Sequence, residues 1–468
     1  MRDYRYILLS INDGIAAKGK RPGFFIRTYG CQMNSRDSEK LSGLLTQLGY
    51  EAVKTQEEAD LILYNTCCVR ENAENKVFGH LSLLKHLKAS KPGLIIAVCG
   101  CMTQQVSIAE KIRAGHPYIN IVFGTFNRHR LPEFIVKSLE QKQIIDIEQD
   151  ENLPELEGVP PTTREYRHKA GVNIMYGCNN YCSYCIVPYV RGPEKSRSIS
   201  DILKEVQALV DDGVKEIMLL GQNVNSYASG GFPYLLRRVS EVLNLKRIRF
   251  MTSHPKDFSD ELIDAVKTLP NVCKSVHLPL QSGSTSILKS MNRQYTKEEY
   301  VNLALRLKES IPGIGLSTDI IVGYPGETEE DFNSTLEVVR QVKFSGAFTF
   351  IYSKRTGTPA ALREDTVPKN VTTERFERLT SAIYPILLER NESFVGQSLS
   401  VMVEDSMGIQ NVPAETDAGF LYNCKGRADD NTLVHFKSKA PLETGQILPV
   451  LVTDARTFYV SGISDYKG

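Results

Sequence analysis

Three cysteines stand close together in the stretch GCNNYCSYCIVPYVRG, at Cys178, Cys182 and Cys185. Three thiols are too many for one disulfide and one too few for a closed four-ligand zinc site. The nearest histidine, His168, precedes the strand expected before this loop and should lie toward its opposite end. An iron–sulfur cube can be held by three thiolates, which leaves one iron open to a ligand that is also a substrate. The spacing favours such a cluster, with zinc as the main alternative.

A second group of cysteines lies near the N-terminus, in loops that follow apolar, strand-like runs. The runs FFIRTYG, ADLILYNTC and LIIAVCGCM alternate with helical patterns between residues 23 and 139, which predicts a small α/β domain with a parallel sheet. Ligands of open α/β sheets bind beyond the carboxyl ends of the strands. The loops that carry Cys31, Cys67 and Cys101 are therefore expected to converge on one object, although spacing alone does not choose Cys67 over Cys68 or Cys101 over Cys99.

The rest of the chain predicts two more domains after a linker. Residues 140–165 are acidic and proline-bearing, as linkers are. Residues 166–391 contain six strand-like runs separated by helical patterns, which predicts a partial (βα)6 barrel with its site at the carboxyl ends of the strands. Residues 392–464 show short alternating runs, which predict a small all-β, OB-like module.

Composition restricts the class of protein and its compartment. The 468 residues carry a formal net charge of +1 and 41% apolar residues, so the overall charge favours no particular partner. We find no apolar run near the roughly 20 residues of a membrane helix and no signal-peptide core. We therefore expect a cytoplasmic protein without a membrane partner. In a reducing compartment, ten cysteines favour metal binding over disulfides.

The CxxxCxxC loop resembles the signature of radical S-adenosylmethionine (SAM) enzymes. The resemblance implies that Cys178, Cys182 and Cys185 hold a 4Fe-4S cluster whose open iron is chelated by the amino and carboxylate groups of SAM. An electron from the reduced cluster then splits SAM into methionine and a 5′-deoxyadenosyl radical. The motif is more specific here because it follows a strand and opens six βα units.

Nearly the whole chain resembles the methylthiotransferases of that superfamily. Their three N-terminal motifs are matched by TYGCQMNSRDSE, NTCCVRENAENKV and CGCMTQQ. The resemblance implies a second, auxiliary 4Fe-4S cluster on Cys31, Cys67 and Cys101. Cys68 and Cys99 stand beside these ligands and are expected to pack as small buried side chains, as are the isolated Cys273 and Cys424.

GCQMN and NTCCVR are most similar to the members that act on tRNA. The resemblance implies that the C2 hydrogen of N6-isopentenyladenosine, at position 37 beside the anticodon, is replaced by SCH3, with SAM as both methyl donor and radical source. It also implies a monomer that binds the anticodon stem-loop and takes electrons from a donor such as flavodoxin or ferredoxin. The alternatives are threonylcarbamoyladenosine or a ribosomal protein aspartate as substrate, and a non-catalytic zinc and RNA-binding module.

Several polar residues are candidates for SAM contacts. Gln222 and Asn223 follow a strand in LLGQN, and Arg191 and Arg197 follow the cysteine loop, where they could pair with the SAM carboxylate or with tRNA phosphate. Ordinary loop hydrogen bonds and solvated arginines are the alternatives. His254 and His277 fit structural roles as well as acid–base roles. In YSKRTGTPA, Lys354 stands where the family usually has proline.

The C-terminal module resembles a TRAM domain, which implies RNA binding. Residues 392–468 nevertheless hold ten acidic residues against six Lys and Arg, whereas residues 161–200 hold six Lys and Arg against two acidic residues. Because phosphate affinity needs local positive charge, the basic surface is expected near the cysteine loop. A small face for stacking or shape contacts is predicted in the module, and surface packing is the alternative. The candidates are Tyr422, Lys425, Arg427, His435 and Phe436.

Overall fold

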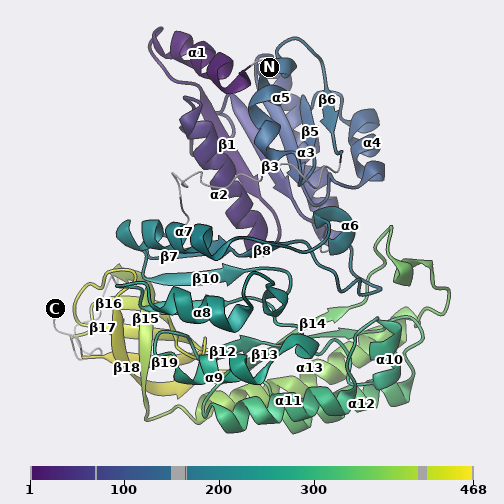
Figure 1. Cartoon of the computed structure of the whole chain (residues 1–468), viewed down its shortest axis with the longest axis vertical. Helices are drawn as coiled ribbons and strands as arrows, with labels where there is room; N and C mark the ends of the chain where they lie inside the picture. The colour runs from purple at the N-terminus through teal and green to yellow at the C-terminus, as the bar shows by residue number, and fades with distance from the viewer. Residues whose placement is uncertain (1–2, 69–70, 149–163, 165, 409–418, 466–468) are drawn as a thin grey trace. The chain divides into compact units, whose positions relative to one another are not determined.

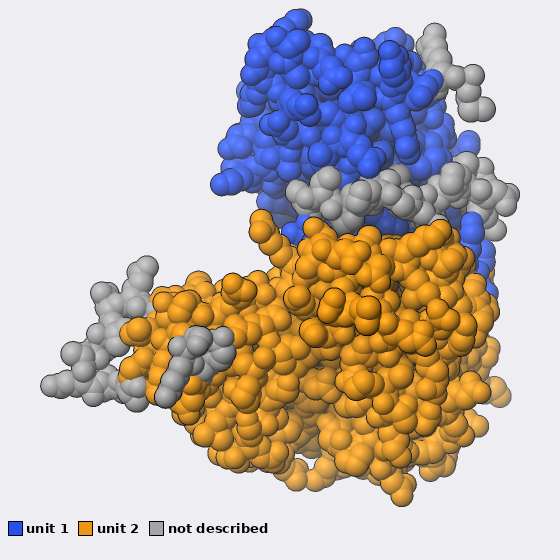
Figure 2. Space-filling view, turned by 60° about the vertical axis from the view of Figure 1, so that its left-hand side comes forward, with its two compact units in different colours: residues 1–165, 176–179, 185–195 blue, residues 166–175, 180–184, 196–468 orange. Residues whose placement is uncertain are grey.

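In the computed structural model (Figure 1), the chain divides into two units, which Figure 2 colours separately. The structure describes residues 3–68, 71–148, 164, 166–408 and 419–465. Unit 1 comprises residues 1–165, 176–179 and 185–195, and unit 2 comprises residues 166–175, 180–184 and 196–468. The chain passes between the units at the short strands β8 (Met175–Tyr176) and β9 (Lys195–Ser196).

Unit 1 is built on a six-stranded sheet in the order β2-β1-β3-β4-β5-β6, and every pair of neighbours is parallel, as predicted. Its strands are β1 (Gly23–Thr28), β2 (Glu51–Ala52), β3 (Leu61–Thr66), β4 (Ile95–Gly100), β5 (Ile121–Phe123) and β6 (Ile144–Asp146). β6 lies inside the range predicted as a linker. Most of the remainder of that range, residues 149–163 and 165, lies outside the described residues.

Helices cover both faces of this sheet. One apolar cluster combines the sheet with α1 (Tyr4–Ala16), α2 (Gln32–Gln47) and α5 (Leu131–Ser138), and the other combines it with α3 (Glu71–Ser90), α4 (Val106–Gly115) and α6 (Val187–Arg191). Helix α1, which was not predicted from the sequence, is amphipathic and buries Leu8. A short 3-10 turn, η1 (Arg128–Arg130), precedes α5.

Unit 2 contains the six predicted strands of a partial (βα)6 barrel. They are β7 (Lys169–Asn173), β10 (Glu216–Leu220), β11 (Arg247–Phe250), β12 (Ser275–His277), β13 (Gly315–Val322) and β14 (Gly346–Ile351). Two parallel three-stranded ladders, β11-β10-β7 and β12-β13-β14, are linked by a bridge between Ile248 and Val272. The apolar runs of the sequence explain this arrangement, because parallel strands covered by helices bury both faces.

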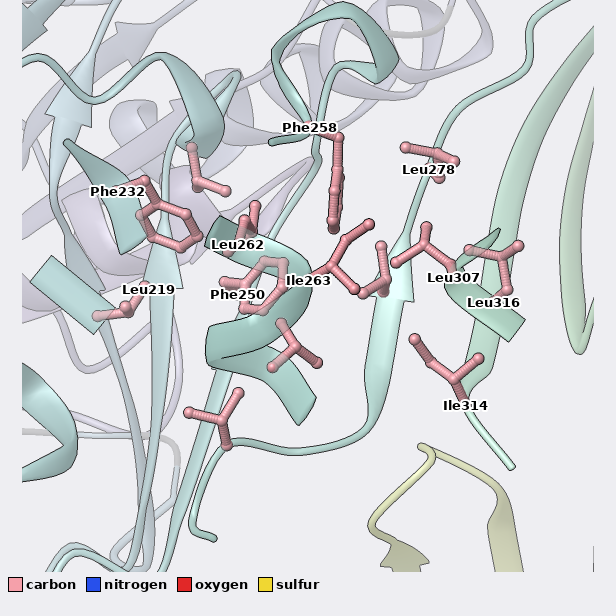
Figure 3. Close-up of a cluster of buried hydrophobic side chains, with 14 of the residues drawn as sticks. Leu219, Phe232, Phe250, Phe258, Leu262, Ile263, Leu278, Leu307, Ile314 and Leu316 are labelled. Carbon is pink, nitrogen blue, oxygen red and sulfur yellow. The ribbon is translucent and has the colours of Figure 1, made fainter. Parts of the chain in front are cut away.

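The barrel helices close over one continuous apolar core. They are α7 (Ile199–Asp211), α8 (Phe232–Ser240), α9 (Asp260–Thr268), α10 (Thr285–Ser290), α11 (Lys297–Ser310), α12 (Glu329–Val342) and α13 (Lys369–Glu392), with 3-10 turns η2 (Val224–Ser226), η3 (Pro255–Asp257) and η4 (Pro359–Leu362). Figure 3 shows part of this core, where Phe232 and Phe250 of neighbouring elements meet edge to face with ring centroids 5.3 Å apart. Such aromatic pairs add to the stabilisation from area burial.

The C-terminal strands form a closed barrel in the order β15-β16-β17-β19-β18, as the alternating pattern predicted. They are β15 (Ser398–Gly408), β16 (Tyr422–Ala428), β17 (Leu433–Ser438), β18 (Ile447–Ala455) and β19 (Val460–Ser464). Alternate residues such as Val401, Val434 and Val450 fill the interior. Residues 409–418, between β15 and β16, lie outside the described part.

Buried arginines join this small barrel to the (βα)6 core. Arg247 donates hydrogen bonds to the carbonyls of Arg427 and Ser400, at 2.7 and 2.8 Å. Arg249 donates to the carbonyl of Ala428 at 2.8 Å and pairs with Glu216 at 2.9 Å. Because Arg247 and Glu216 begin their strands, the module is anchored at the amino-terminal ends of the core strands, away from their carboxyl ends.

None of the helices in the described ranges is long and apolar enough to span a bilayer.

Candidate cluster-binding sites

Three neighbouring strands of unit 1 each lead into a cysteine. Cys31 follows β1, Cys67 directly follows β3, and Cys101 directly follows β4. In the sheet, β1 pairs with β3 and β3 pairs with β4, all in parallel. The three cysteine loops therefore start side by side at the carboxyl ends of adjacent strands. Open α/β sheets bind their ligands at this end.

Two glycines allow these loops to approach closely. Gly30 has φ +110°, and a Cβ built on it would lie 2.3 Å from the Cβ of Cys67 and 2.6 Å from its sulfur. Gly100 has φ +107°, and its Cβ would lie 2.3 Å from the carbonyl oxygen of Thr66. Any side chain at either position would be strained and would push the loops apart. The residues that precede Cys31 and Cys101 are thus glycines for a local steric reason.

The first turns of α2 tie the loops together. The amide of Asn34 donates to the carbonyls of Tyr29 and Thr66, both at 2.9 Å, and so links the end of β1 to the end of β3. Asn65 donates to the carbonyl of Asn34 at 2.9 Å and to the hydroxyl of Ser38 at 3.0 Å. Asn34 and Asn65 are fully buried, so this network fixes the loop backbone.

Cys31 occupies the N-cap position of α2, and its side chain forms no capping hydrogen bond. The positive end of the dipole of α2 therefore lies beside Cys31.

A buried charge cluster adjoins the sulfur of Cys101. The Nε of Arg191 lies 3.1 Å from that sulfur, and the Nη2 of the same side chain donates to Asn34 at 2.7 Å and to Asp37 at 3.0 Å. Arg128 pairs with the same oxygen of Asp37 at 2.5 Å. Burial acts to raise the pKa of Asp37, but these arginines, with Lys40, hold it below its usual value.

The thiol of Cys101 is correspondingly acidic. A hydrogen bond with Cys68 and the charge of Arg191 lower its pKa to about 6, against the opposing effect of burial. A thiolate, not a thiol, is the metal-binding form of cysteine. The surroundings of Cys101 thus favour the form that a cluster needs.

The two neighbouring cysteines differ in their placement. Cys99 packs in the apolar cluster on the opposite face of the sheet from Cys101, and burial raises the pKa of its thiol. Residues two apart in a regular strand share a face, so it is the left-handed backbone of Gly100, at the end of β4, that separates Cys101 from Cys99. Cys68 instead packs in the same cluster as Cys101 and is its hydrogen-bonding partner. Cys67 and Cys68 are both buried, and the choice of Cys67 as the ligand stays a prediction.

The donor set and its surroundings fit an iron–sulfur cluster. Three cysteine loops begin at the same end of the sheet, and the buried guanidinium of Arg191 lies against the sulfur of Cys101. Over the described residues, no three His, Cys, Asp or Glu side chains already stand in the arrangement of a bound metal ion. The loops are thus prepared in position and charge, and closing the sulfurs around a cluster requires side-chain adjustment.

The second cysteine loop is divided between the units. In unit 1, the amide of Cys178 donates to the carbonyl of Gly192 at 3.1 Å, and a Cβ on Gly177 would lie 1.9 Å from the carbonyl oxygen of Pro193. In unit 2, a guanidinium nitrogen of Arg293 lies 3.4 Å from the sulfur of Cys182. Cys185 belongs to unit 1 and directly precedes the segment that forms α6. Arg293 is buried and was not anticipated from sequence.

The predicted SAM contacts have other partners in the structure. Arg197 donates to the carbonyl of Asn173 at 2.6 Å and pairs with Glu205 at 2.7 Å. Asn223 donates to Asp257 at 2.7 Å, and half-buried Gln222 precedes it after β10. Arg191 contacts Cys101, Asn34 and Asp37, which all belong to unit 1. The assignment of all four residues to SAM stays a prediction.

The two histidines have structural surroundings. His254 is buried, its Nδ1 accepts from the amide of Lys256, and burial with nearby Arg293 lowers its pKa to about 2. His277 is hydrogen-bonded to Ser317 at 3.0 Å. A histidine that stays neutral and accepts a backbone hydrogen bond suits loop stabilisation.

The predicted RNA face of the small barrel is smaller than expected. Lys425 pairs across the strands with His435, and both are exposed; Arg427 lies two residues along on the same side. Phe436 is 3% exposed and fills the barrel interior, because it alternates with His435 along β17. Tyr422 is half-buried against that interior. The prediction was therefore wrong for Phe436.

Comparison with known proteins agrees with this architecture. Residues 172–339 match the model of the radical SAM superfamily, and residues 23–124 match the model described as uncharacterized protein family UPF0004. Among solved structures, the radical S-adenosylmethionine methyltransferase TsrM from Kitasatospora setae has a TM-score of 0.56 at 15% identity, covering 73% of this chain and 77% of that chain, a likeness in fold. The fold and the cysteine loop thus define a radical SAM enzyme, a class that uses a 4Fe-4S cluster and SAM.

Relatives with similar sequences identify the family within the radical SAM enzymes. The chain is 48% identical to the tRNA-2-methylthio-N(6)-dimethylallyladenosine synthase of Acetivibrio thermocellus, over 95% of this chain and 91% of the relative. It is 49% identical to the protein of the same name from Clostridium novyi, over 94% of this chain and 96% of the relative. The chain belongs to the tRNA-2-methylthio-N(6)-dimethylallyladenosine synthase family.

Proposed function

We propose that this enzyme methylthiolates tRNA, replacing the C2 hydrogen of N6-isopentenyladenosine at position 37, beside the anticodon, with SCH3. SAM serves as both methyl donor and radical source. The aromatic C–H bond resists ordinary acid–base chemistry, so cofactors must carry the difficult step. The proposal rests on family membership. In the structure it is supported by the three cysteine loops, which follow the carboxyl ends of three adjacent parallel strands.

Two sets of three cysteines are proposed to hold two 4Fe-4S clusters. Cys178, Cys182 and Cys185 hold the cluster that binds SAM, and the auxiliary cluster is held by Cys31, Cys67 and Cys101. When bound, the first cluster would supply the electron that splits SAM to give the carbon radical, and the open iron of the auxiliary cluster would carry the sulfur to be transferred. The residues of the chain orient these ligands and shield them from water.

In unit 1, specific residues carry out that task. Asn34 and Asn65 lock the cysteine loops through buried hydrogen bonds, and Gly30 and Gly100 let the loops approach. Arg191 and Asp37 set the charge beside Cys101. Each of these side chains or backbones acts on the position or ionisation of a thiol.

The substrate is proposed to be the anticodon stem-loop of tRNA, bound by a monomer in the cytoplasm. Electrons are supplied by a donor such as flavodoxin or ferredoxin. Lys425, Arg427 and His435 of the small barrel are proposed to contact the RNA backbone, since they form its shared outer face. The names of the relatives support tRNA over a protein substrate.

Two measurements test the function. A strain lacking the gene should lose 2-methylthio-isopentenyladenosine from its tRNA and accumulate isopentenyladenosine, and the wild-type gene should restore the modified base. Loss of 2-methylthio-threonylcarbamoyladenosine instead would redirect the substrate assignment. The reconstituted, reduced protein should release 5′-deoxyadenosine when given SAM and an isopentenylated stem-loop. Failure of that release with both clusters loaded would contradict the proposed reaction.

A further inference from the structure

Arg191 belongs in sequence to the SAM-binding cysteine loop, but its side chain lies in unit 1. It ends α6, the helix that begins two residues after Cys185. Ile186 and Val190 of this segment pack in the apolar cluster that contains Cys101. The hydroxyl of Thr125 also donates to the carbonyl of Val190, at 2.5 Å. The loop that supplies Cys185 is therefore built into the core beside the auxiliary cysteines.

The guanidinium of Arg191 is fully engaged in that position. Its side chain is 4% exposed and reaches the sulfur of Cys101, Asn34 and Asp37. Cys31 also lies within its electrostatic reach. A buried guanidinium fixed by two oxygen acceptors cannot swing away without leaving those acceptors unpaired, which costs free energy.

Three buried basic side chains gather around Asp37. Arg128 and Arg191 both pair with it, and Lys40 adds its charge near the same carboxylate. Thiolates that hold a cluster supply negative charge, and hydrogen bonds to cluster sulfurs and local net charge set its reduction potential.

We propose that Arg191 is a positioning residue of the auxiliary cluster, which orients Cys101 through its Nε–H and raises the reduction potential of that cluster through its charge. This inference rests on the proposed function, because it requires a cluster on Cys31, Cys67 and Cys101. It replaces contact with the SAM carboxylate as the main role of this arginine. Reduction adds negative charge to a cluster, so a fixed cation beside a ligand sulfur stabilises the reduced form.

The test uses the full chain with Cys178→Ala, Cys182→Ala and Cys185→Ala, which isolates the auxiliary cluster. Reconstituted R191Q, R191K and R128Q variants of this reference are compared by iron and sulfide content and by redox titration followed by EPR. R128Q is the matched control, since it removes a positive charge from the same carboxylate. Circular dichroism confirms the fold of each protein.

We expect R191Q to have a lower midpoint potential than the reference, with R191K between them and R128Q shifted less than R191Q. If R191Q binds no iron, R191K decides: a lowered midpoint supports the proposal and an unchanged midpoint overturns it. Loss of iron from both Arg191 variants, but not from R128Q, supports the positioning role. A folded R191Q with full iron and an unchanged midpoint overturns the proposal.

SAM binding separates this role from the alternative. In the otherwise wild-type protein, R191Q is expected to bind SAM with unchanged affinity. A tenfold or greater loss of SAM affinity with an unchanged auxiliary midpoint would assign Arg191 to SAM instead. If the three-alanine reference itself holds no iron, the two-cluster function fails, and that result is distinct from any effect of Arg191.

Discussion

Gly30 lies directly against Cys67, so closely that a Cβ on the glycine would overlap the Cβ and sulfur of the cysteine. This contact joins the loop after β1 to the loop after β3. The left-handed backbone of Gly30, with φ +110°, makes the contact possible. The distance between two proposed ligands, Cys31 and Cys67, is therefore set by a residue that binds nothing itself.

Replacing Gly30 with alanine should weaken the auxiliary site. The strained backbone alone costs about 1–3 kcal/mol, and the overlap adds to it. We expect G30A to bind about half the iron of the wild-type protein after reconstitution, with a lowered melting temperature. G79A is the matched control, because nothing lies within 4 Å of a Cβ at this exposed site in α3. Unchanged iron content in G30A would contradict the proposed role of this contact.

Serine substitutions should identify the auxiliary ligands. Two 4Fe-4S clusters correspond to about eight irons per chain, so C31S, C67S and C101S should each fall to about four. C68S and C99S should retain the full content, although C99S leaves a buried hydroxyl and lowers stability. Cys68 is the informative control, because it is the hydrogen-bonding partner of Cys101. If C68S lost iron and C67S retained it, Cys68 and not Cys67 would be the ligand.

His254 should make unit 2 sensitive to acid. Its pKa is about 2 in the folded protein, against about 6.5 in the unfolded chain, so only the unfolded chain takes up a proton between these values. Stability from this group is complete above pH 6.5 and is lost as the pH falls. Urea denaturation of the cluster-free chain should show the wild-type advantage over H254N shrinking by about 1.4 kcal/mol per pH unit below 6.5. A constant difference between pH 7.5 and pH 5 would show that His254 takes up a proton in the folded protein as readily as in the unfolded chain.

Arg249 should be essential for the attachment of the small barrel. Its side chain is 5% exposed, and it pairs with Glu216 while donating to the carbonyls of Ala428 and Asp429. Replacement by methionine leaves Glu216 buried without its partner, which costs about 3–5 kcal/mol. Chemical denaturation should detect this loss, and the R249M/E216Q double variant should recover part of it. Equal losses in the single and double variants would show that the carbonyl contacts, not the ion pair, dominate.

Most of the architecture could be predicted because apolar periodicity is a local signal. The six strands of the (βα)6 core, the parallel sheet of unit 1 and the closed C-terminal barrel all follow from runs of buried residues and the turns between them. The helix α1 was missed because its buried side is short and includes the polar Asn12 beside Leu8. β6 was missed because a three-residue edge strand carries almost no pattern of its own.

The charge cluster at the auxiliary site could not be predicted in the same way. Asp37 and Lys40 lie in a polar helical stretch, SRDSEKLSG, which is typical of a solvated face. Their burial depends on Arg128 and Arg191, which are about 90 and 150 residues away in sequence. Similarly, nothing near Cys182 in the sequence indicates Arg293. Long-range pairing of charges is a property of the tertiary structure, and a single sequence does not encode it as a pattern.

In the described residues, the strand edges of the unit 1 sheet and of the small C-terminal barrel leave little for a foreign strand to pair with. The five C-terminal strands close into a ring, and the parallel sheet of unit 1 ends in β2, of two residues, and β6, of three. Unpaired edges are the usual template for cross-chain ladders and fibrils. Blunted edges in these two parts of the chain therefore act against association of one copy with another through strand pairing.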